Sequence, residues 1–146
     1  MYIVNNNTYY IYFDGNKTIV NELGIEFYYD YNIIKKILEN SCLYYGSSFN
    51  GRIDGAKSYI QSKYLLPIII SDKNEIVLFP VKGVKNDEII WFNLKYVKNY
   101  IKINEFVEII FFNDFRKKYM ISYNIFNNQI LKASRLWYVS LNRWCW

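Results

Sequence analysis

The segment SCLYYGSSFNGR, residues 41–52, holds the side chains of this sequence that are best suited to chemistry. Cys42 is a potential nucleophile, the Gly-Ser-Ser step at 46–48 a potential phosphate site, and Arg52 a potential anion ligand. Nucleophilic serine or cysteine catalysis usually needs a histidine base, and the chain contains no histidine. The lysine of a Walker-type nucleotide loop is missing as well. The segment therefore favours a capped helix start or a phosphate contact over catalysis.

Metal binding and enzyme chemistry have little support in the rest of the chain. Two cysteines without histidine cannot complete a four-ligand zinc site, and Cys42 is expected to be a small core residue. Catalysis by carboxylates or lysine stays open, but no pair of acidic residues forms a motif that separates it from ordinary surface charge. We therefore expect no enzyme activity, no metal and no small-molecule substrate.

Positive charge gathers toward the C-terminal end of the sequence. The net charge is +5, with −2 in residues 1–40, +1 in residues 41–90 and +6 in residues 91–146. A basic half of this kind predicts an anionic partner, with nucleic acid as the first candidate. A basic surface that only keeps the protein in solution is an equally good interpretation of charge alone.

Composition predicts one packed domain over residues 1–146. Of the 146 residues, 52% are hydrophobic and 21% aromatic, which is typical of a strand-rich globular protein. No apolar run reaches the length of a membrane span, and the first residues do not resemble a signal peptide. We expect a soluble cytoplasmic α+β protein, mostly antiparallel β-sheet with about three helices including a C-terminal one.

These elements must position the candidate residues. Strand patterns and turn residues predict three hairpins, with turns at 14–15, 72–74 and 113–114, and one strand over 88–97. Helical spacing predicts helices over 30–40, from residue 48 to about 60, and over 123–139. Residues 42–45 are expected to be a strand or the extended entry to the second helix. Its apolar face and the buried stripe of the third helix are assigned to Phe49, Ile53, Ala56 and Ile60, and to Phe126, Ile130, Ala133 and Trp137.

Several short motifs occur in an order and spacing that resemble a known family. They are Cys42, 46–48, 51–52, Pro67, 79–80, Trp91, 122–124 and 128–129. From about residue 33 to residue 138 the chain is similar to the ComK-like competence transcription factors of low-GC Gram-positive bacteria. The resemblance implies a regulator of DNA-uptake genes that binds paired A/T-rich boxes of double-stranded DNA, largely through the minor groove. It also implies a homodimer that assembles further on DNA, to a tetramer for example, control by a proteolytic adaptor, and no cofactor.

The chain departs from the family pattern in three places. Val81 follows Phe-Pro where the family has threonine, residues 113–114 replace a frequent Asn-Gly turn, and the sequence ends at Trp146 where some members continue. We expect a short member that binds DNA with altered activation. The alternative is a short homologue that acts through a full-length regulator or a proteolytic adaptor.

Basic and polar side chains on the predicted elements are the candidate DNA contacts. Arg52 ranks first because it lies in the most family-specific motif and arginine suits an A/T-rich minor groove; pairing with a carboxylate is its alternative. Helix capping is the alternative for the two serines before it. Strand alternation sends Arg116 and Lys118 to one face and Lys117 to the other. The full set is Ser47, Ser48, Arg52, Lys82, Lys85, Lys95, Lys98, Arg116, Lys117, Lys118, Asn128, Lys132 and Arg135.

Overall fold

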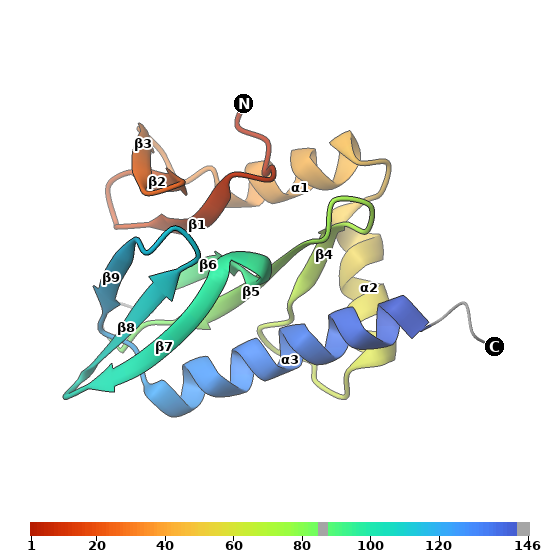
Figure 1. Cartoon of the computed structure of the whole chain (residues 1–146). Coiled ribbons are helices and arrows are strands. Elements are labelled where there is room, and N and C mark those ends of the chain that lie inside the picture. The colour runs from red at the N-terminus through yellow and green to blue at the C-terminus, as the bar shows by residue number, and fades with distance from the viewer. Residues whose placement is uncertain (85–87, 143–146) are drawn as a thin grey trace.

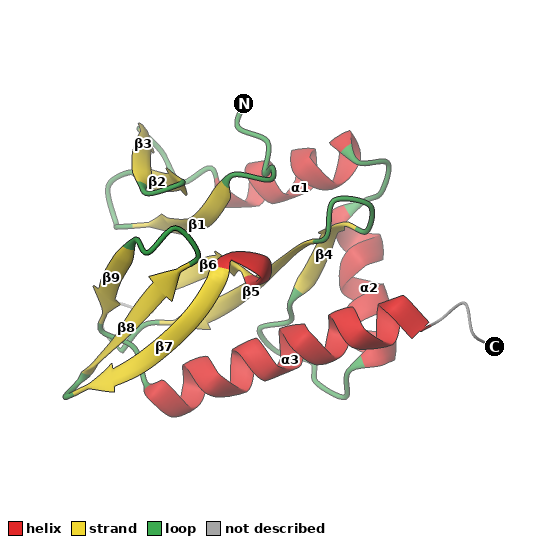
Figure 2. Cartoon of the chain, viewed as in Figure 1, coloured by secondary structure: helices red, strands yellow, loops and turns green. Residues whose placement is uncertain are grey.

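The computed structural model describes residues 1–84 and 88–142. Over these ranges the chain forms nine strands, three α-helices and one short 3-10 helix, so the α+β prediction is confirmed (Figures 1 and 2). The elements are β1 Thr8–Phe13, β2 Thr18–Glu22, β3 Ile25–Tyr29, α1 Ile34–Tyr44, α2 Phe49–Tyr59, β4 Ile68–Ser71, β5 Ile76–Lys82, β6 Ile89–Asn93, η1 Leu94–Tyr96, β7 Val97–Ile103, β8 Phe106–Phe111, β9 Arg116–Tyr119 and α3 Tyr123–Asn142.

The strands form two antiparallel sheets. The larger has six strands in the order β3-β2-β1-β6-β5-β4, and the smaller has three in the order β7-β8-β9. All three predicted hairpins are confirmed, as β1–β2, β4–β5 and β8–β9. Gly15 at φ 97° and Asp114 at φ 66° occupy the left-handed region that tight turns require.

Helices and the smaller sheet cover the larger sheet on both faces (Figure 1). Helix α1 packs on one face, over Ile11, Val20 and Ile70. The smaller sheet and α3 together cover the other face, where Phe92 lies in the same core as Phe111 and Phe126. Helix α2 packs against edge strand β4 and contacts both α1 and α3. Strand alternation explains this arrangement, because successive side chains of one strand supply both cores.

Helix α1 begins and ends later than predicted. It includes Cys42, Leu43 and Tyr44, so the expectation of a strand or an extended entry there is wrong. Ser41 and Cys42 continue the buried face of Ile37 and Leu38 at helical spacing, and this packing holds the extra turn. The chain leaves the helix through Gly46 at φ 87°, a conformation that glycine adopts readily.

The predicted strand over 88–97 is wrong, because it is two strands in different sheets. Strand β6 ends at Asn93, η1 turns the chain, and β7 begins at Val97 in the smaller sheet. The Asn93 amide donates a hydrogen bond of 2.9 Å to the Thr8 carbonyl and fixes the exit from β6. A run of alternating apolar residues hides such a corner, since both halves have strand character.

Helix α3 exists as predicted and continues three residues further, but its buried stripe is rotated. Its buried residues are Phe126, Gln129, Ala133, Leu136 and Ser140, while Ile130 and Trp137 are half-buried at the edge of that stripe. Gln129 is buried because its amide donates to two carbonyls, Leu65 at 2.8 Å and Pro80 at 2.7 Å. Apolar spacing alone could not reveal a glutamine at the centre of a helix interface.

Candidate nucleic-acid interface

The start of α2 is held by contacts within the molecule. Ser48 is the N-cap, and its hydroxyl accepts a 3.0 Å hydrogen bond from the Gly51 amide. Ser47 donates to the Cys42 carbonyl at 3.2 Å and accepts from Arg52 Nε at 3.1 Å. The capping alternative is therefore confirmed for Ser48, whereas Ser47 links the end of α1 to Arg52.

Arg52 is paired with a carboxylate. Its Nη2 lies 3.1 Å from Asp72 Oδ2, and its side chain is only 18% exposed. The guanidinium thus joins α2 to the turn between β4 and β5. Cys42 beside it is buried, and burial raises the pKa of its thiol, so it is the small core residue expected from the sequence.

The basic run on β9 divides between two faces, as alternation predicted. Arg116 and Lys118 are exposed, and Lys117 is half-buried between them. Arg116 Nη1 lies 3.4 Å from Glu108 Oε1 in an exposed ion pair. Glu108 is also the register partner of Lys118 across β8 and β9. The outward pair remains accessible, because exposed ion pairs of this kind are weak.

Lys117 points inward, into a group of tyrosines beside an acidic side chain. Its Nζ lies 3.2 Å from both Glu26 Oε2 and the Tyr10 hydroxyl. The same ammonium is 5.2, 5.5 and 5.7 Å from the ring centroids of Tyr10, Tyr12 and Tyr119, within range for cation–π attraction. Lys117 therefore ties β9 to the β1–β2–β3 end of the larger sheet.

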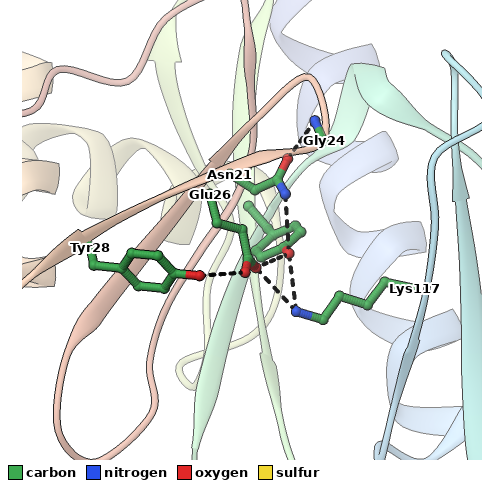
Figure 3. Close-up of polar contacts among 6 residues, drawn as sticks. Asn21, Gly24, Glu26, Tyr28 and Lys117 are labelled. Carbon is green, nitrogen blue, oxygen red and sulfur yellow. Dashed lines mark hydrogen bonds and ion pairs between the residues drawn. The ribbon is translucent and has the colours of Figure 1, made fainter.

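Further hydrogen bonds complete this group, as Figure 3 shows. Tyr28 donates to Glu26 Oε1 at 3.2 Å, and Tyr10 donates to Glu26 Oε2 at 2.6 Å. The Asn21 amide donates to the Tyr10 hydroxyl at 3.2 Å. Partial burial opposes the charge of Glu26, but the hydrogen bonds from Tyr10 and Lys117 outweigh it and lower the pKa of Glu26. We call Tyr10, Asn21, Glu26, Tyr28 and Lys117 the β9 latch.

The lysines at the corner between the two sheets have different environments. Lys95 donates to Asn6 Oδ1 and to the Asn74 carbonyl, both at 2.7 Å, and burial lowers the pKa of its ammonium. It braces the N-terminal segment against the β4–β5 turn. Lys98 is exposed and lies 3.2 Å from Asp114, which is exposed too.

The candidate DNA contacts on α3 also differ in their exposure and partners. Asn128 and Arg135 are exposed. Lys132 donates to Ser62 Oγ at 3.1 Å and to the Tyr64 carbonyl at 3.3 Å, and burial lowers the pKa of its ammonium. Lys82 ends β5 and is half-buried. Lys85 lies outside the described residues.

The fold brings some of these side chains onto one surface. The smaller sheet and α3 cover the same face of the larger sheet, so their outer sides face the same direction. This surface carries Lys98, Arg116, Lys118, Asn128 and Arg135. Lys102, an exposed residue of β7 that sequence reasoning missed, lies on the other side of the smaller sheet, because it pairs with the buried Val107 and is in line with Tyr119. The signal for Lys102 was its place in the strand sequence VKNYIKI, where it follows the lysine at position 98 by four residues. We call Lys98, Arg116, Lys118, Asn128 and Arg135 the outer basic surface.

A family model described as ComK protein matches residues 1–144. The chain belongs to this family. It is 32% identical over 103 residues to the competence transcription factor of Bacillus subtilis (strain 168), and the match covers 69% of this chain and 53% of that protein. The chain thus spans about half the length of this curated relative. No solved structure matches the chain significantly.

The resemblance read from the sequence motifs is therefore confirmed at the level of the family. Within residues 1–84 and 88–142 of this ComK-family chain, no group of three or more Cys, Asp or Glu side chains could hold a metal ion. None of the helices in the same ranges is both long and apolar enough to cross a membrane.

Proposed function

We propose that this chain is a DNA-binding transcriptional regulator of competence genes that acts in the cytoplasm, at the nucleoid. The observation that carries the proposal is the outer basic surface. Its four cations and its one amide were already candidate DNA contacts from the sequence. Family membership and the similarity to the competence transcription factor of Bacillus subtilis support the same function. The partner is double-stranded DNA with A/T-rich sites.

Phosphate neutralisation supplies most of the affinity in this proposal. Arg116 and Lys118 project from β9 on the outer side, and Lys98 lies on β7 of the same sheet. Cations spread over the two edge strands of a sheet can follow a curved phosphate backbone, and each phosphate contact releases bound counterions. The two acidic partners, Glu108 and Asp114, hold Arg116 and Lys98 at 3.4 and 3.2 Å until a phosphate replaces them.

Arginine in a narrow minor groove supplies the preference for A/T-rich DNA. Arg116 and Arg135 are the exposed arginines among the described residues, whereas Arg52 is paired with Asp72. We assign groove contact to this exposed pair and a positioning role to Arg52. Lys95, Lys117 and Lys132 have internal partners and hold the elements that carry the outer basic surface.

A salt titration of DNA binding tests the proposal. The full chain is mixed with an A/T-rich duplex carrying two boxes, and with a G/C-rich duplex of the same length, at a series of salt concentrations. We expect tighter binding to the A/T-rich duplex, competition by a minor-groove ligand, and a steep fall of affinity with salt. Equal, weak binding to both duplexes would contradict the proposal and favour the alternative of a homologue that acts through protein partners.

A further inference from the structure

The outer edge of β3 is an open end of the larger sheet. Strand β3 is last in the order of that sheet, and within the described residues no strand pairs with its outer side. The opposite edge differs, because β4 is buried along its length and α2 packs against it. Natural proteins usually protect an open edge with lysine, proline or a bulge. Strand β3, Ile-Glu-Phe-Tyr-Tyr, contains neither residue, and its pairing with β2 is regular.

The hairpin geometry determines which backbone groups of β3 are open. Leu23 and Gly24 form the two-residue turn before β3, with φ 56° and 96°, as in a type I′ turn. The two residues that flank such a turn, Glu22 and Ile25, exchange two backbone hydrogen bonds with each other. Along the two strands, hydrogen-bonded pairs of this kind alternate with pairs that are not hydrogen-bonded. Residues 25, 27 and 29 therefore bond to β2. The N–H and carbonyl groups of Glu26 and Tyr28 point outward.

Exposed apolar side chains gather along the same edge. Ile25 is 65% exposed and Phe27 43% exposed, and both lie on the strand itself. Leu23 and Tyr31, exposed as well, continue the row beyond the two ends of the strand. The charged side chain of β3, Glu26, is turned toward Lys117 in the β9 latch and does not repel a neighbouring strand (Figure 3).

We propose that a second copy of this chain binds at this edge, with the two β3 strands antiparallel about a two-fold axis at Phe27. The outward N–H and carbonyl groups of Glu26 in each copy then form hydrogen bonds with those of Tyr28 in the other copy. The strand is self-complementary in this register: Ile25 faces Tyr29, Phe27 faces its own copy, and the flanking Leu23 and Tyr31 face each other. An isologous contact of this type closes after two copies.

The charge distribution favours a second copy at this edge over a nucleic acid. Residues 1–40 carry a net charge of −2, while the outer basic surface lies on the smaller sheet and α3. Pairing through β3 joins the two larger sheets edge to edge and leaves both outer basic surfaces uncovered. The proposal does not depend on DNA binding, so it is tested without DNA.

Disulfide trapping is the sharpest test. In a Cys145→Ser background, Phe27→Cys is compared with Ile25→Cys under mild oxidation. At the proposed axis the two residue-27 Cα atoms lie about 4.5 Å apart, as in a non-hydrogen-bonded antiparallel pair, which permits a disulfide. The two residue-25 positions lie four residues out of register, about 13 Å apart. We expect a covalent dimer from Phe27→Cys and none from Ile25→Cys. Equal cross-linking of the two, or none from Phe27→Cys, overturns the register.

Sedimentation equilibrium at high salt gives the second measurement. We expect the unmodified chain to form dimers and Phe27→Lys, which places like charges opposite each other, to be monomeric. Tyr28→Pro removes one outward N–H and should weaken the dimer as well. Circular dichroism reports whether each variant is folded. The matched control is Leu131→Lys, at an apolar exposed site on α3. If Leu131→Lys is monomeric while Phe27→Lys remains a dimer, the interface lies on α3 and not at β3. If the unmodified chain is a monomer, the proposal is refuted.

Discussion

The start of α2 and strand β9 carry the two arginine sites that matter most in this chain, and they use arginine differently. Arg52 is 18% exposed and lies 3.1 Å from Asp72, with Ser47 as a further partner. Arg116 is 56% exposed and lies 3.4 Å from Glu108. A half-buried, paired arginine positions its surroundings, whereas an exposed one is available to a phosphate. The family-specific motif that ranked Arg52 first does not indicate whether an arginine is paired within the protein or exposed.

The same contrast recurs within three consecutive residues of β9. Arg116 and Lys118 face outward, and Lys117 enters the β9 latch. The alternation of a strand separates a binding role from a structural role by one position. Each of the following changes tests whether that separation holds.

The largest effect is expected for Lys117→Met. The change removes the ammonium from Glu26 and from three tyrosine rings, and it leaves the partly buried carboxylate without its counter-charge. We expect the free energy of unfolding to fall by about 2 kcal/mol, measured by urea denaturation. At a temperature where the variant is folded, its affinity for DNA should depend on salt concentration as steeply as that of the unmodified chain. A reduced salt slope would mean that Lys117 contacts DNA.

The β9 latch also predicts an acid-sensitive part of the stability. The folded-state pKa of Glu26 is lowered below its ordinary value of 4.5, since hydrogen bonds from Tyr10 and Lys117 outweigh partial burial. A lowered carboxyl pKa contributes stability that is present above the unfolded value and is lost as pH falls through the folded value. The free energy of unfolding, measured from pH 6 down to the acid limit, should therefore decrease below about pH 4.5. This loss should be smaller in Glu26→Gln, and an identical profile would exclude Glu26 as its source.

The second effect in size is expected for the double change Arg116→Ala with Lys118→Ala. Removing two phosphate contacts should reduce affinity for an A/T-rich duplex about tenfold at moderate salt and lower the salt slope by about two. Stability should change little, because both side chains are exposed. Lys35→Ala with Lys36→Ala, on α1 away from the outer basic surface, removes the same charge and serves as the control. Equal losses in both double variants would show that net charge, not this surface, determines binding.

These contrasts also show what sequence patterns could predict. Turn residues and alternation identified the hairpins, and the spacing of Phe49, Ile53 and Ala56 identified α2, because such signals are local. The corner at Asn93 and the burial of Gln129 depend on partners more than forty residues away. The ion pair of Lys117 with Glu26 likewise joins residues 91 positions apart. Long-range partners of polar side chains decide which candidate cations remain exposed, and a single sequence does not reveal them.

A smaller effect is expected for Arg52→Gln. The change breaks the ion pair with Asp72 and the hydrogen bond to Ser47, so the free energy of unfolding should fall by about 1 kcal/mol. The proposed role of Arg52 predicts an unchanged salt slope for DNA binding in a gel-shift titration. A slope lowered by about one, with stability intact, would instead assign a phosphate contact to the start of α2.

The smallest effect is expected for Ser48→Ala, which removes the N-cap of α2. Its hydroxyl accepts from the Gly51 amide at 3.0 Å, and the residue is exposed, so water replaces part of the lost bond. We expect a loss of about 0.7 kcal/mol in thermal or urea unfolding, and recovery of most of it in Ser48→Asp, since aspartate is also a strong N-cap. DNA affinity separates the two roles of this serine. An added negative charge at a phosphate contact would weaken binding strongly, whereas a purely capping residue leaves the affinity of Ser48→Asp close to that of the unmodified chain.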